Sequence, residues 1–162
     1  MESTHQDTEY LVRKTSNAGY RAFSLITPPL YTAYILARRG RGAFSINGVL
    51  RSTWIAGVGG AIGGAGIGYA RYAYTSPETV RAKRVQTAYD TNRIRAEDHS
   101  TIGGILFSVI TPAVLWKRAK IYNLILGGLS LGSGVGTLTH YFRAITGDPP
   151  PQVQLPDAPY SS

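Results

Sequence analysis

The 162-residue chain contains no cysteine. It can therefore form no disulfide, thiolate zinc site, iron–sulfur ligation or c-type haem attachment. The three histidines, His5, His99 and His140, are far apart in the sequence and lack the spacing of metal ligands. We expect His140 to be a residue of the membrane interface. No set of residues has the arrangement of a catalytic site, so the sequence predicts neither an enzyme nor a bound cofactor.

Charge is also missing from four long stretches of the chain. Residues 22–37, 52–70, 100–116 and 121–142 contain no Asp, Glu, Lys or Arg. A membrane-spanning helix needs about 20 mainly apolar residues, with a range of roughly 17–25, and the shortest stretch suffices if a flanking arginine extends to the interface. A soluble helical bundle is the alternative, but soluble helices usually carry a polar face. We therefore expect an all-α membrane protein with four transmembrane helices.

The same order of segments occurs twice along the chain. Residues 19–28 resemble residues 103–112, and the glycine-rich segment 58–68 resembles the segment 126–136, in both cases without an internal gap. Each half is a span with a Thr-Pro step, a basic loop and a glycine-rich span. This order predicts two duplicated helical hairpins in parallel orientation. The prolines are expected to make fixed kinks, because no ionisable residue lies in mid-span as in a transport pathway.

The sequence divides into five parts. These are a polar N-terminal arm at 1–19, a transmembrane hairpin at 20–74, a connector with a short amphipathic helix at 75–99, a second transmembrane hairpin at 100–145 and an extended proline-rich tail at 146–162. Ser76-Pro77-Glu78 is typical of a helix start and predicts where the connector helix begins. The acidic pair Glu97-Asp98, beside His99, is expected to be exposed and to cap the third span.

Glycines four residues apart lie on one face of each glycine-rich span. Such faces let helix backbones pack closely. The predicted packing residues are Gly60, Gly64 and Gly68 in the first hairpin and Gly128, Gly132 and Gly136 in the second. The pattern leaves open whether they pack against the other hairpin or another subunit. Phosphate-binding glycine loops follow a strand, so glycines within apolar spans do not indicate nucleotide binding.

The formal net charge is +8, and the loops within the two hairpins contain basic but no acidic residues. The positive-inside rule places these loops on the matrix or cytoplasmic side and both termini on the opposite side. The basic residues are expected to contact headgroups of an anionic phospholipid such as cardiolipin. They are Arg38, Arg39, Arg41, Lys117, Arg118 and Lys120. No nucleic-acid-binding motif accompanies the charge, so no nucleic acid is expected as a partner.

These features together resemble the Tim17/Tim22/Tim23 superfamily of the mitochondrial inner membrane. The resemblance covers about residues 20–145, and its most specific part is the sequence DHSTIGG at 98–104, followed by the second series of glycines. The superfamily includes subunits of protein translocases and the B14.7-type accessory subunit of respiratory complex I. The Thr-Pro steps and the proline-rich tail look like a lineage-specific, fungal version.

The resemblance implies a non-catalytic accessory subunit that supports the assembly and stability of the complex I membrane arm. Its partners would be other membrane subunits of that large respiratory complex, and both termini would face the intermembrane space. One alternative is a Tim17-type component of an inner-membrane protein translocase, for which we would expect a polar or acidic cavity that the spans do not indicate. The other is a membrane-shaping oligomer that associates through its glycine faces.

Overall fold

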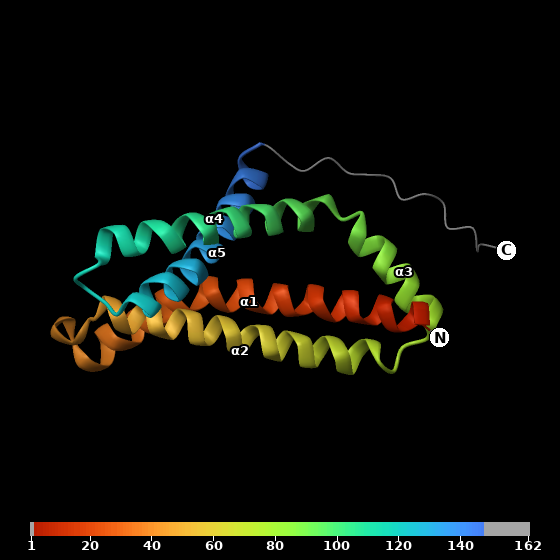
Figure 1. Ribbon diagram of the computed structural model, residues 1–162, viewed down its shortest axis with the longest axis horizontal. Coiled ribbons are helices and arrows are strands. Elements are labelled where there is room, and N and C mark those ends of the chain that lie inside the picture. The colour runs from red at the N-terminus through yellow and green to blue at the C-terminus, as the bar shows by residue number, and fades with distance from the viewer. Residues whose placement is uncertain (1, 148–162) are drawn as a thin grey trace.

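The computed structural model describes residues 2–147, so the predicted tail lies outside the described residues except for its first two positions. The described chain is helical and contains no strand (Figure 1). Its elements are α1 (Glu2–Arg39), the short 3₁₀ helix η1 (Arg41–Ala43), α2 (Ile46–Tyr72), α3 (Pro77–Ala88), α4 (Thr91–Leu115) and α5 (Ile121–Thr146). The predicted all-α class is confirmed.

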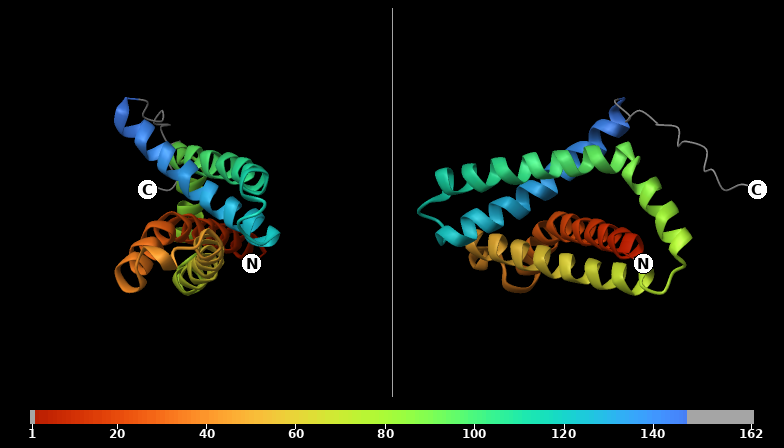
Figure 2. Two further views of the ribbon diagram at one scale, coloured as in Figure 1. Left: turned by 90° about the vertical axis from the view of Figure 1, so that its left-hand side faces the viewer. Right: turned by 45° about the vertical axis from the view of Figure 1, so that its right-hand side comes forward.

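The long helices form two antiparallel pairs, α1 with α2 and α4 with α5. Both hairpin turns lie at the same end of the molecule, and α3 connects the pairs at the opposite end (Figure 1). The pairs form two layers, with α5 running obliquely across them (Figure 2). Helix α5 packs against α4, α2 and α1, whereas α1 and α4 contact each other very little. The fold is therefore held together across its middle by α5.

Side chains are distributed in an unusual way between the interior and the surface. Several of the most buried residues are small and polar, including Ser24, Thr53 and Ser130, each at most 1% exposed. Large aliphatic side chains point outward, and Ile67 and Val114 are 70% and 72% exposed. Lipid solvates such side chains, while small residues let helices approach closely. This distribution is typical of helices that pack in a bilayer. Among the described residues, α4 and α5 are long and apolar enough to cross a membrane.

Helix α1 begins at Glu2 and continues without interruption through Pro28 and Pro29 to Arg39. Residues 2–19 of the predicted polar arm are thus the first turns of the helix that contains the first uncharged stretch. One side of these turns packs against α3, and Leu11 of α1 and Val80 of α3 are 2% and 1% exposed. Arg84 on α3 donates a hydrogen bond to the carboxylate of Asp7. This contact gives the N-terminal turns of α1 a partner other than water.

The connector consists of α3 and the beginning of α4. Helix α3 starts at Pro77 as predicted, although the Ser76 hydroxyl bonds to the Thr79 hydroxyl at 2.8 Å and caps no backbone N–H. The prediction that Glu97-Asp98 and His99 cap the third span is wrong. Helix α4 begins at Thr91, because the side chain of Asp90 accepts a hydrogen bond from the backbone N–H of Arg93 at 3.1 Å. The acidic pair consequently lies inside α4.

The glycine faces pack within their own hairpins. The Cα face of Gly60 lies against the backbone of Gly19, and that of Gly64 against the backbone of Thr15. In the second hairpin, Gly132 lies against the backbone of Gly103. Gly136 meets the carbonyl of His99, and Gly68 and Gly128 likewise face α1 and α4. A Cβ atom at any of these six glycines would lie closer than 3.0 Å to an atom of the neighbouring helix. The helix that packs against each glycine face is therefore the first helix of the same hairpin.

These contacts define which positions of the two hairpins correspond. Gly60 packs on Gly19 and the Phe23 ring, and Gly132 packs on Gly103 and Phe107 in the same way. Gly60 therefore corresponds to Gly132. The gapless alignment of 58–68 with 126–136 instead pairs Gly60 with Gly128, which lies four residues earlier. The alignment of the two glycine-rich segments was wrong by four residues. Because the glycines recur every four residues, the segments match almost equally well when one is moved by four positions.

The substitution Gly64→Ala tests this close packing, with Gly63→Ala as the matched control on the same helix. The methyl group at position 64 would meet the Thr15 carbonyl, so we expect the free energy of unfolding to fall by about 1–3 kcal/mol. Nothing lies within 4 Å of a Cβ at Gly63, so that variant should be neutral or more stable by up to about 1 kcal/mol. Unfolding in detergent, followed by circular dichroism, measures both changes. Equal effects of the two variants would contradict the described packing.

Candidate functional site: a charged cavity between α1 and α4

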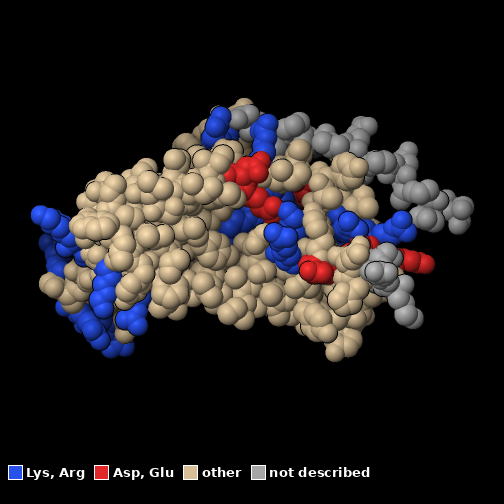
Figure 3. Space-filling model, viewed as in Figure 1, with Lys and Arg blue, Asp and Glu red and all other residues tan. Residues whose placement is uncertain are grey.

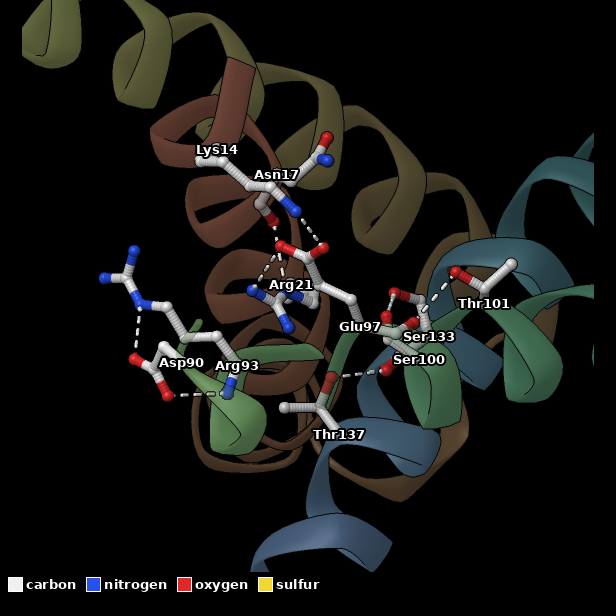
Figure 4. A network of polar contacts seen from close by, with 10 residues as sticks. All are labelled: Lys14, Asn17, Arg21, Asp90, Arg93, Glu97, Ser100, Thr101, Ser133 and Thr137. Carbon is white, nitrogen blue, oxygen red and sulfur yellow. Dashed lines mark hydrogen bonds and ion pairs between the residues drawn. The ribbon is translucent and has the colours of Figure 1, made fainter. Parts of the chain in front are cut away.

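A cluster of three charged side chains lies between α1 and α4 (Figure 4). Lys14 Nζ donates a hydrogen bond to Glu97 Oε2 at 2.5 Å, and Arg21 Nη2 lies 3.7 Å from Glu97 Oε1. The Lys14, Arg21 and Glu97 side chains are 22%, 13% and 21% exposed. One half-buried carboxylate is therefore shared by two cations, and the cluster has a net positive charge.

Beside this cluster is a cavity of about 270 Å³. Side chains from three helices line it. They are Asn17, Tyr20 and Arg21 from α1, Glu97, Ser100, Thr101, Gly104 and Ile105 from α4, and Leu129 and Ser133 from α5. One part of the lining is charged or hydroxylated, and the other part is apolar. The cavity forms because α1 and α4 both pack on α5 but contact each other very little.

Hydroxyl groups fix the walls of the cavity to α5. The Tyr20 and Ser130 hydroxyls are 2.7 Å apart, and the Ser100 and Ser133 hydroxyls are 2.5 Å apart. Because a buried hydroxyl without a partner is costly in an apolar medium, these pairs hold α1 and α4 in place on α5. The cavity is thus a built feature of the helix packing.

This polar cavity was not predicted from the sequence, and its charged residues, Arg21 and Glu97, lie just before the uncharged stretches of α1 and α4. Lys14 and Glu97 are separated by 83 positions, so no local spacing connects them. A weaker signal exists within each helix. Lys14, Asn17 and Arg21 recur at three- and four-residue intervals, as one helix face requires. This polar face, which lies just N-terminal to the first uncharged stretch, indicates a binding site on α1. It does not indicate that Glu97 on α4 completes the site.

The two histidines of the second hairpin lie together. His140 is 4% exposed, its Nε2 is 2.7 Å from Asn92 Oδ1, and its ring centroid is 5.6 Å from that of His99. His140 is thus buried in the helix packing, where Asn92 supplies a polar partner, and its position at the membrane interface stays a prediction. Across the described part of the chain, no group of three or more His, Asp or Glu is arranged to hold a metal ion.

The predicted lipid-contacting residues lie together at one end of the molecule. Figure 3 shows basic side chains without acidic ones at the end that carries both hairpin turns. Next to this end is a band of surface without charge, and beyond the band lie side chains of both signs (Figure 3). The six residues, Arg38, Arg39, Arg41, Lys117, Arg118 and Lys120, are all exposed. The tertiary structure therefore joins the two basic loops into one surface.

Comparisons of the chain with family models, with curated proteins and with solved structures find no match. The features of the chain that bear on function are therefore the cavity, the charged surface and the packing of the helices.

The substitution Glu97→Gln tests the cluster, with the exposed neighbour Asp98→Asn as its control. Glu97→Gln leaves two half-buried cations without their carboxylate, and we expect the free energy of unfolding to fall by about 1–2 kcal/mol after allowance for partial screening by solvent. Asp98→Asn should change it by less than about 0.5 kcal/mol. Denaturant unfolding in a neutral detergent measures the difference, and similar values for the two variants would show that the cluster does not stabilise the fold.

Proposed function

We propose that this chain crosses the mitochondrial inner membrane four times and is a non-catalytic structural subunit of a large complex, namely an accessory subunit of the respiratory complex I membrane arm. The observation that carries the membrane proposal is the reversed distribution of side chains. Leu30 on α1 and Ile62 on α2 are 67% and 69% exposed, while the helix contacts are made by glycine and hydroxyl residues. In water, an apolar surface of this extent would favour aggregation.

The proposal extends from α4 and α5 to all four long helices. At about 1.5 Å per residue, the uncharged stretches 22–37 and 52–70 are about 24 Å and about 28 Å long, close to the hydrocarbon thickness of about 30 Å. Helices α1 and α2 pack directly against α5. A bilayer that contains α5 therefore has to surround them as well.

The contacts also support an origin by duplication. Ser16 donates a hydrogen bond to the carbonyl of Ala61 at 3.0 Å, and Ser100 bonds to Ser133 at 2.5 Å. These two contacts connect corresponding positions when the hairpins are matched through Gly60 and Gly132. A shared set of backbone contacts is harder to obtain by chance than a shared glycine composition.

The basic surface supports the proposed orientation. By the positive-inside rule, positive charge at both hairpin turns favours the matrix side for these turns and the intermembrane space for the opposite end of the hairpins. There the basic surface would bind an anionic phospholipid such as cardiolipin, with about 1 kcal/mol for each Lys or Arg near the lipid surface. The opposite end carries both signs of charge (Figure 3), so its surface as a whole attracts anionic headgroups less strongly.

A structural role fits the way in which the glycine faces are used. All six predicted packing glycines face the partner helix of their own hairpin. A homo-oligomer that associates through these faces would have to open the hairpins, so this alternative loses its basis. The outer faces of the helices remain apolar and are suited to lipid and to other membrane subunits.

A second function, as a component of a protein translocase, is favoured by the cavity itself. The cavity contains the polar and acidic groups that we expect of a translocation path, including Glu97 and Asn17. Against this role, Glu97 is paired with Lys14 and Arg21, so the site is not acidic overall. We therefore retain the translocase as the second candidate.

Blue-native separation of mildly solubilised mitochondria, followed by mass spectrometry, tests the two functions. We expect the chain to migrate at near-megadalton size together with NADH dehydrogenase activity. Deletion of the chain should lower the amount of assembled complex I and leave the import of precursor proteins unchanged. Migration in a smaller band with presequence receptors would instead support the translocase, and a band of this chain alone would contradict both functions.

A further inference from the structure

We propose that the cavity between α1 and α4 binds the phosphate group of an anionic phospholipid, whose acyl chains lie along the apolar surface beside Ile105 and Leu129. This inference rests on the proposed insertion of the chain into a membrane. It concerns a site at the other membrane boundary from the basic surface at the hairpin turns. Its evidence is the charge of the cluster, its position and the shape of its lining.

The charge of the cluster calls for an anion. Among the described residues, Glu97 is the one carboxylate that contacts both Lys14 and Arg21, which leaves one positive charge in a half-buried site. A buried charge without compensation is strongly destabilising. A phosphate diester carries the single negative charge that would compensate it.

Arg21 has the donors to hold such a group. Its side chain is 13% exposed and lines the cavity. Within residues 2–147 it makes two polar contacts, and both are long, at 3.4 Å from Nε to the carbonyl oxygen of Asn17 and 3.7 Å from Nη2 to the Glu97 carboxylate. A guanidinium has five N–H donors in a planar fork and binds phosphate through two parallel hydrogen bonds. The fork is therefore only weakly occupied by protein groups.

The site lies at the height where phosphate groups are expected. Arg21 directly precedes the uncharged stretch 22–37, and Glu97-Asp98 directly precedes the uncharged part of α4. The side chains of mixed charge border the uncharged band of the surface (Figure 3). This border is the level at which the hydrocarbon of a bilayer ends and its headgroups begin.

The lining has the polarity of a lipid. Its charged and hydroxyl groups come from Arg21, Glu97 and Ser100, whereas Ile105 and Leu129, which are 59% and 38% exposed, form its apolar side. A volume of about 270 Å³ lies just below the roughly 300–1,000 Å³ of pockets that enclose drug-sized ligands. The cavity therefore accommodates the headgroup region, and the acyl chains remain in the surrounding lipid.

The test uses the full-length protein, purified in neutral detergent and stripped of lipid. Native mass spectrometry measures the binding of phosphatidylglycerol and of phosphatidylcholine with the same acyl chains. We expect the wild-type protein to bind phosphatidylglycerol more tightly. Arg21→Gln should weaken this binding about tenfold, the effect of one lost charge-assisted hydrogen-bond pair. The control Arg93→Gln removes the same charge from an exposed residue of α4 that pairs with Asp90, and it should retain the binding.

A second variant gives a change of opposite sign. Glu97→Gln removes the carboxylate that competes for the two cations, so binding of phosphatidylglycerol should become about tenfold tighter. The lipid should also restore the thermal stability that this variant loses. If Arg21→Gln loses affinity for the lipid only because it unfolds, Glu97→Gln should not gain affinity. The two variants together therefore distinguish loss of a binding group from loss of folding.

Several outcomes would overturn the proposal. Equal binding of the two lipids would contradict the lipid site. Equal affinities of Arg21→Gln and Arg93→Gln for phosphatidylglycerol would contradict it as well. Displacement of the lipid by millimolar inorganic phosphate would assign the cavity to a soluble anion. Displacement by an acidic peptide would assign it to a protein partner.

Failure of the lipid site and failure of the proposed function are distinguishable. Extraction of mitochondrial membranes with alkaline carbonate shows whether the chain is inserted in the bilayer. A chain that is released by carbonate would contradict both proposals. A chain that remains in the membrane and binds phosphatidylglycerol no better than phosphatidylcholine would contradict the lipid site alone.

Discussion

The close approach of helix backbones at glycine is the constraint on which the rest of this structure depends. Gly60 against Gly19 and Gly132 against Gly103 bring two helices together at distances that no side chain would allow. Where the backbones are so close, the helix interface has room only for small residues such as Ser24 and Ser130. The large aliphatic side chains have to point outward, which produces a surface suited to lipid and to neighbouring subunits.

Helix α5 adds a second layer of contacts to this arrangement. It presents one glycine face to α4, and it uses Gly127 against Leu50 and Gly134 against the backbone of Ser24. Helix α2 also contacts α5, but part of its glycine-rich surface faces no other helix, since nothing lies within 4 Å of a Cβ at Gly59 or Gly63. Because both hairpins are joined mainly through α5, the outer sides of α1 and α4 diverge. The cavity is a geometric consequence of that asymmetry.

The charges in the cavity have a cost that bears on function. A half-buried carboxylate shared by Lys14 and Arg21 stabilises the contact between α1 and α4, yet it leaves excess positive charge in a partly buried site. The basic surface at the hairpin turns is exposed and pays no comparable desolvation cost. If the chain crosses a membrane as proposed, the two features lie at opposite boundaries, with attraction to the lipid surface at one and a defined polar cavity at the other.

Local patterns in the sequence determined the helical class, the uncharged stretches, the start of α3 and the glycine faces, because each depends on residues within a few turns of one another. They also determined that the hairpin loops are basic. The tertiary structure alone decided which helix each glycine face meets, the four-residue shift between the hairpins and the burial of His140 beside Asn92. It also decided the pairing of Lys14 with Glu97, since residues so far apart in the sequence meet only through the oblique packing of α5 on both hairpins.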